Sequence, residues 1–189
     1  MMEFMKPQPA VNENSWSSLT WDQVGDNELL AYCSSKKLAE EAAWEFMKTE
    51  SPNFALTTIT APYSLVLNSI DPSTTEAQKE GSAVFADARD VAFAHVAPLS
   101  TTSMNNKRIL PYAASYCTQT VLNSMNKVPV LKGKVAVGEP HYCDTEEYKK
   151  SLHVVDNSES VKLLGHLKFI SLDKCVADIY EQYYRVNNL

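Results

Sequence analysis

The sequence predicts an α/β fold, because short runs of β-branched and aromatic residues alternate with helical patterns along its 189 residues. Hydrophobic residues make up 44% of the chain and charged residues 21%, as in an ordinary globular protein. This length suits one domain, or one domain with a small appendage, and is enough to bury a sizeable core. A wholly disordered chain is therefore not expected.

The strongest predicted helix covers residues 28–50. It follows a polar segment, residues 1–27, which we expect to be an irregular loop packed down by Trp16 and Trp21. Apolar side chains with helical spacing predict the buried face of the helix, and Pro52 enforces its end. That apolar stripe consists of Ala39, Ala42, Ala43, Phe46 and Met47. Charged residues occupy much of the remainder: Lys37, Glu40, Glu41, Glu45 and Lys48.

A buried strand is predicted at 54–60, where FALTTIT is rich in aromatic and β-branched residues, and Pro62 ends it. The other predicted elements are shorter. Strands are expected at 83–86 and 108–112, extended chain at 64–67, turns at 68–82, mostly loop at 128–150, and helices at 87–97, 118–127, 157–164 and 171–184. Thr118 is a candidate cap of its helix, and Ser171 and Asp173 suit the start of the last one.

Composition excludes several classes of function. Seventeen basic residues against 23 acidic ones give a net charge of −6, so no nucleic-acid partner is predicted. No apolar run has the length of a membrane span or of a signal peptide. The four cysteines lack zinc-ligand spacing, so we predict no metal and a reduced, cytoplasmic protein. None of the five glycines lies within four residues of another, so a Gly-rich phosphate loop is absent.

The chemistry-bearing motif is YCSSK, in which Tyr32 and Lys36 lie one turn apart on the predicted helix 28–50. A free tyrosine is a poor proton donor at neutral pH, but a nearby ammonium favours the phenolate. The pair could therefore hand a proton to a developing alkoxide beside a hydride carrier.

Longer blocks around this motif carry a resemblance. They are NENSW from residue 12, YCSSKKLAE from 32, AAWEF from 42, DARDVAFAH from 87, VPVLKG from 128 and DNSESVKLLG from 156. Together they resemble the yeast NADPH-dependent methylglyoxal reductases, in the dihydroflavonol-reductase-like extended branch of the short-chain dehydrogenases/reductases. The resemblance runs from about residue 11 to the C-terminus.

The resemblance implies NADPH as cofactor, a small carbonyl substrate, and a Rossmann-type fold that lacks its N-terminal Gly-rich βαβ units. Tyr32 would be the proton donor and Lys36 its activator and a ribose ligand. Pro62 and Leu65 would lie over the nicotinamide. Residues 28–100 would be the remnant of the catalytic domain, and residues 101–189 a small substrate-side region.

The sequence also departs from the family. Only 31 residues precede Tyr32, and the family's catalytic serine has no counterpart, since Ser15, Ser17 and Ser18 do not match its position. These departures leave alternatives open. The chain could be a reductase impaired by truncation or a shortened gene model. It could also be a non-catalytic truncated paralogue, either without function or associating through an exposed sheet edge with itself or a full-length reductase.

Overall fold

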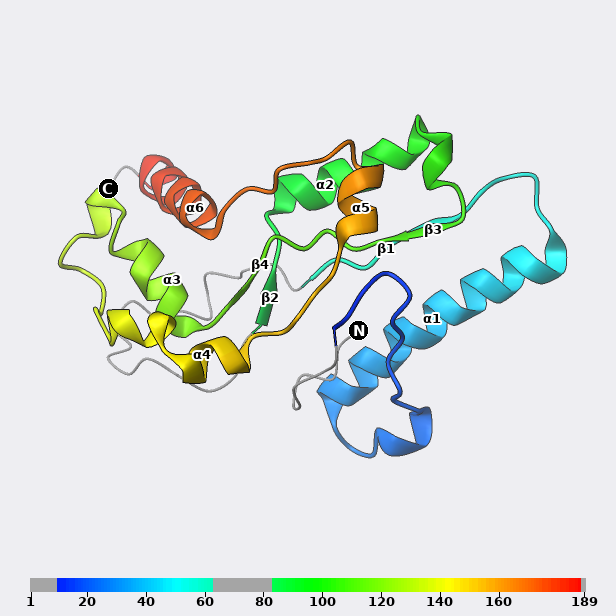
Figure 1. Ribbon diagram of the computed structural model, residues 1–189, viewed down its shortest axis with the longest axis horizontal. Coiled ribbons are helices and arrows are strands. Elements are labelled where there is room, and N and C mark those ends of the chain that lie inside the picture. The colour runs from blue at the N-terminus through cyan, green and yellow to red at the C-terminus, as the bar shows by residue number, and fades with distance from the viewer. Residues whose placement is uncertain (1–9, 63–82, 188–189) are drawn as a thin grey trace. The chain divides into compact units, whose positions relative to one another are not determined.

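The computed structural model describes residues 10–62 and 83–187 (Figure 1). The chain divides into two compact units, each built from three separate stretches of sequence. The first unit comprises Met1–Thr60, Ala92–Pro111 and Val154–Leu167, and the second comprises Ala61–Val91, Tyr112–His153 and Lys168–Leu189. The predicted division at residues 27 and 100 stays a prediction.

The first unit is built on the long helix α1 (Glu28–Glu50) and a short parallel ladder (Figure 1). Strand β1 (Thr57–Ile59) pairs with strand β3 (Lys107–Ile109), with Thr58 opposite Arg108. Helix α5 (Ser158–Leu163) belongs to the same unit.

Helix α1 has the predicted bounds. Asn27 caps its start, with Oδ1 accepting a hydrogen bond from the Leu30 backbone N–H at 3.1 Å. Its end is set by Ser51, which has a left-handed φ of 45°, followed by Pro52.

The predicted buried face of α1 is wrong. Ala39, Ala42 and Phe46 are exposed, and only Ala43 and Met47 of the predicted stripe are half-buried. The fully buried residues of the helix are instead Cys33 and Ser34. Polar bonds made by Glu40, described below, hold a different face of α1 against the ladder.

The strands are shorter than predicted. Strand β1 covers three residues instead of seven and is half-buried, while Phe54 is 56% exposed. Strand β3 ends at Ile109, before the predicted 112, and strand β4 (Ala114–Tyr116) was not predicted. Strand β2 (Ala83–Phe85) confirms the prediction at 83–86.

The second unit contains the antiparallel pair β2–β4 and three further helices: α3 (Thr118–Met125), α4 (Glu146–Ser151) and α6 (Leu172–Val186). Its core packs α3 against α6. The buried members of this core are Val121, Leu122, Met125, Val128, Leu131, Val135, Val176 and Tyr180.

Of the two predicted helix caps, the structure has one at the predicted residue and one at its neighbour. Ser171 caps α6 as expected, with Oγ accepting from the Lys174 N–H at 3.3 Å. Thr118 is not a cap but the first residue of α3, because Cys117 takes the N-cap position and Thr120 Oγ1 bonds its N–H. Helix α4 occupies part of the predicted loop 128–150.

The remaining helical predictions are confirmed. Helix α2 (Ala88–Val96) and α5 lie within the predicted ranges 87–97 and 157–164. Residues 64–67 and 68–82, for which extended chain and turns are predicted, lie outside the described residues. Pro62, just before them, is described. Within residues 10–62 and 83–187, no helix is both long and apolar enough to cross a membrane.

Candidate functional site

The Tyr32–Lys36 pair lies in the first half of α1. The Lys36 ammonium Nζ is 5.3 Å from the centre of the Tyr32 ring, as expected for residues one helical turn apart. Tyr32 is 51% exposed and Lys36 is also exposed. Both side chains are therefore accessible to small molecules.

Cys33 lies beside the pair in sequence but points into the protein. Its side chain is buried, and this burial raises the pKa of the thiol. A thiol held protonated in this way is a poor nucleophile, so Cys33 is a packing residue.

Glu40, one turn beyond Lys36, holds α1 to the ladder. Its Oε1 accepts hydrogen bonds from Arg108 Nε at 2.8 Å, Thr58 Oγ1 at 2.6 Å and Trp44 Nε1 at 3.2 Å. Its Oε2 accepts a second bond from Arg108, from Nη2 at 3.1 Å. Burial would raise the pKa of Glu40, but the bonds from Arg108, Thr58 and Trp44 outweigh it and lower the pKa.

Arg108 also holds the segment that precedes α1. Its Nη1 donates to the backbone carbonyl oxygens of Glu13 at 2.7 Å and Ser15 at 2.8 Å. Its guanidinium carbon lies 4.2 Å from the centre of the Trp16 ring. Trp16 therefore contacts Arg108 although it is 41% exposed, whereas Trp21 is 58% exposed, so the prediction that both tryptophans pack this segment down is supported only for Trp16.

A buried carboxylate continues this network. Glu13 Oε1 accepts from the Ser160 backbone N–H at 2.8 Å and from Ser160 Oγ at 2.6 Å. From the sequence alone, Glu40 is one of the charges on the remainder of the helix, and Glu13 and Arg108 have no predicted role. For Glu40, the sequence signal is its spacing: it follows Tyr32 and Lys36 at intervals of four residues, which places it on the same side of the helix.

Pro62 and Leu65 stay predictions as cofactor-contacting residues. Pro62 is half-buried and belongs to the second unit, and Leu65 lies outside the described residues. Ser15 Oγ accepts from the Asn12 N–H at 3.0 Å and is thereby engaged within its own loop.

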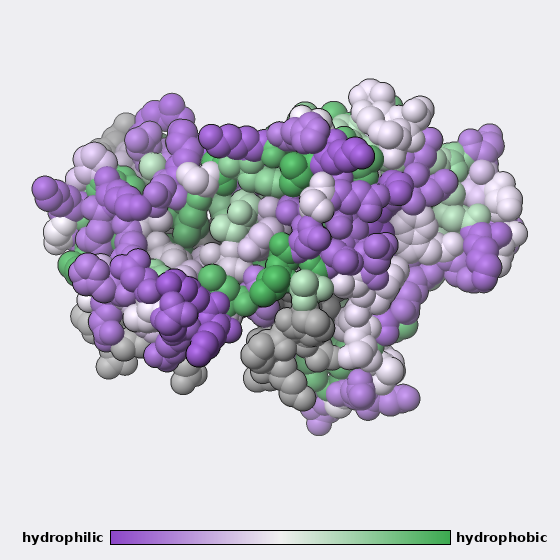
Figure 2. Space-filling view, in the orientation of Figure 1, coloured by the Kyte–Doolittle hydropathy of each residue, from purple (hydrophilic) through white to green (hydrophobic). Residues whose placement is uncertain are grey.

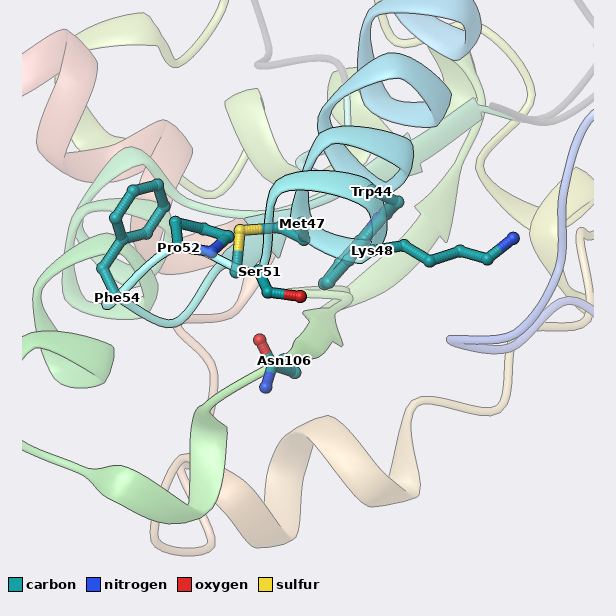
Figure 3. Close-up of a pocket in the computed structure, with 7 residues that line it drawn as sticks. All are labelled: Trp44, Met47, Lys48, Ser51, Pro52, Phe54 and Asn106. Atoms are coloured by element: carbon teal, nitrogen blue, oxygen red, sulfur yellow. The ribbon is translucent and has the colours of Figure 1, made fainter.

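A hollow of about 390 Å³ lies at the far end of α1 (Figure 3). Its lining residues are Trp44, Met47, Lys48, Ser51, Pro52, Phe54 and Asn106. Trp44 follows Tyr32 by 12 positions, about 18 Å along a helix. The hollow is therefore separate from the Tyr32–Lys36 pair. In the described part of the chain, no three His, Cys, Asp or Glu side chains gather as metal ligands.

No family model matches the chain. It is 32% identical to the NADPH-dependent methylglyoxal reductase GRE2 of Saccharomyces cerevisiae, over 90% of this chain and 56% of that protein. The chain thus spans little more than half the length of the curated relatives it matches.

Solved structures of related enzymes also match this chain over little more than half of their own length. The yeast methylglyoxal/isovaleraldehyde reductase Gre2, complexed with NADPH, matches with a TM-score of 0.76 and 29% identity, over 94% of this chain and 57% of that one. A UDP-glucuronic acid 4-epimerase from Bacillus cereus, complexed with NAD, shares the fold at a TM-score of 0.62 and 15% identity, over 98% of this chain and 58% of that one. The predicted α/β, partial Rossmann-like fold is confirmed. The chain is therefore a homologue of the C-terminal part of the Gre2-type methylglyoxal reductases.

Proposed function

We propose that this chain carries the proton-transfer residues of an NADPH-dependent reductase of aldehydes and ketones of the methylglyoxal type. The observation that carries the proposal is the accessible Tyr32–Lys36 pair, with Nζ 5.3 Å from the ring centre. The pair lies in a chain homologous to NADPH-dependent methylglyoxal reductases.

In this proposal Tyr32 is the general acid. Its hydroxyl donates a proton to the carbonyl oxygen of the substrate, and the product is an alcohol. The Lys36 ammonium stabilises the phenolate that remains, until water returns the proton to Tyr32. NADPH, when bound, supplies the hydride that adds to the carbonyl carbon.

The residues present fit one end of that cofactor. Lys36 is exposed, and its ammonium would donate to the ribose hydroxyls next to the nicotinamide. The five scattered glycines form no phosphate loop. We therefore expect this chain by itself to bind NADPH more weakly than its longer relatives do.

The first experiment measures NADPH binding by fluorescence and NADPH-dependent loss of methylglyoxal. Lys36→Met should raise the Kd or KM for NADPH about tenfold or more, since it removes a charged hydrogen-bond donor. Lys48→Met is the matched control, because Lys48 is an exposed lysine of the same helix. Equal effects of the two substitutions would contradict the role of Lys36.

A second candidate function is non-catalytic: the chain would be an interaction partner of a full-length reductase. Hydrophobic residues reach the surface of the molecule (Figure 2), and on α1 they include Leu38, Ala39, Ala42 and Phe46. Among the described strands, β1 pairs only with β3, and in this candidate function the other edge of β1 would accept a strand of the partner.

Analytical ultracentrifugation with and without a full-length Gre2-type reductase tests this candidate. This second candidate predicts an association that Phe46→Glu abolishes, together with no detectable NADPH binding. A monomer that unfolds cooperatively, binds NADPH and ignores the reductase would exclude it.

A further inference from the structure

Glu40 is tied to two neighbouring strands at once. Thr58 on β1 and Arg108 on β3 are opposite each other in the parallel ladder, and both donate to its carboxylate. Tyr32, Lys36 and Glu40 follow one another at intervals of four residues, so they lie along one side of α1. Glu40, which anchors the helix to the ladder, therefore lies on the same side of α1 as the proposed catalytic pair.

The geometry of these bonds restricts rotation of the helix. Arg108 binds both carboxylate oxygens, and such a planar two-point contact fixes orientation as well as distance. The side chains of Glu40 and Arg108 are only 18% and 12% exposed, so water competes little for these bonds. Turning or sliding α1 on the ladder would break at least one of them.

We propose that Glu40 is a positioning residue that fixes the rotation of α1 on the β1–β3 ladder and thereby the placement of Tyr32 and Lys36. This inference rests on the proposed function of the pair. Its consequence for catalysis is large, because a misplacement of about 1 Å can cost about a hundredfold in rate.

A readout that needs neither cofactor nor substrate tests the placement. With fluorotyrosine incorporated, fluorine NMR gives a signal for Tyr32 that Tyr32→Phe identifies. Glu40→Gln should shift or broaden this signal and leave that of Tyr180, buried in the second unit, unchanged. Glu45→Gln is the matched control, since Glu45 is exposed and its carboxylate lies 3.8 Å from the exposed Lys48 ammonium.

The same variants separate this inference from the proposed function. In an active protein, Glu40→Gln should lower kcat about tenfold or more and change the KM for the carbonyl less than about twofold. Thr58→Val removes one donor without leaving a charge unpaired, so it should give a smaller change of the same kind. An unmoved Tyr32 signal in Glu40→Gln overturns the inference, whether or not the chain consumes NADPH.

Discussion

Arg108 and Glu40 are joined by two hydrogen bonds across 68 positions of sequence, at 2.8 Å and 3.1 Å. Arg108 binds the loop before α1 with the same guanidinium group. One side chain thus joins the loop, the helix and the ladder of the first unit.

Arg108→Ala should lower the free energy of unfolding by about 3 kcal/mol, because it leaves the Glu40 carboxylate charged in a site largely closed to water. Urea denaturation measures the change. Lys107→Ala is the control: Lys107 and Glu159, 2.9 Å apart, are each 45% exposed, so their pair should contribute less than about 1 kcal/mol. Equal losses from the two substitutions would contradict the role given to Arg108.

At neutral pH the ionised Asp87 carboxylate should raise the free energy of unfolding, and the ionised Asp90 carboxylate should lower it. Hydrogen bonds from Arg89 lower the pKa of Asp87 to about 2, whereas burial raises the pKa of Asp90 above its usual value. A lowered folded-state pKa adds stability that is present above the unfolded pKa near 3.8 and is lost as the pH falls toward 2. A raised pKa means that ionised Asp90 costs stability at neutral pH.

Asp87→Asn should therefore lower the unfolding free energy at neutral pH by at most about 2 kcal/mol, with the difference from wild type shrinking in acid. Asp90→Asn should raise it, because the amide oxygen can still accept the Ile170 N–H bond of 2.8 Å without a buried charge. Denaturation curves at several pH values measure both variants. Parallel pH profiles for the two would refute the assignment.

Asn27→Ala should destabilise the protein by about 1 kcal/mol, because the Leu30 N–H loses its capping oxygen at the start of α1. Asn27→Asp keeps an acceptor there and should cost little. Thermal unfolding of the two variants measures the difference. An Asn27→Asp variant as unstable as Asn27→Ala would contradict a capping role.

Local sequence signals were sufficient to predict the bounds of α1 and the proximity of Tyr32 and Lys36. The helical spacing and Pro52 lie within or directly after the helix that they predict, whereas the cap at Asn27 is a finding of the structure. The separation of four residues places Lys36 beside Tyr32 through helix geometry alone. The same reasoning found the cap of α6 at Ser171.

Contacts between distant residues were not predictable in this way. Nothing near Arg108 in sequence indicates Glu40, and nothing near Glu13 indicates Ser160, because each pair meets only after β1, β3 and α5 have come together. The predicted apolar stripe of α1 differs from its buried face for the same reason. Hydrophobic spacing predicts a face that favours burial, but the charged bonds of Glu40 determine which face meets the ladder.

Proton donation by Tyr32 is the step on which the proposed carbonyl reduction depends. The most direct measurement compares NADPH-dependent reduction of methylglyoxal by the wild-type chain, Tyr32→Phe and Tyr183→Phe, whose tyrosine is 52% exposed against 51% for Tyr32. Tyr32→Phe should lose about a hundredfold or more in rate, and Tyr183→Phe should keep the wild-type rate. A Tyr32→Phe variant as active as the wild type would contradict proton donation by Tyr32.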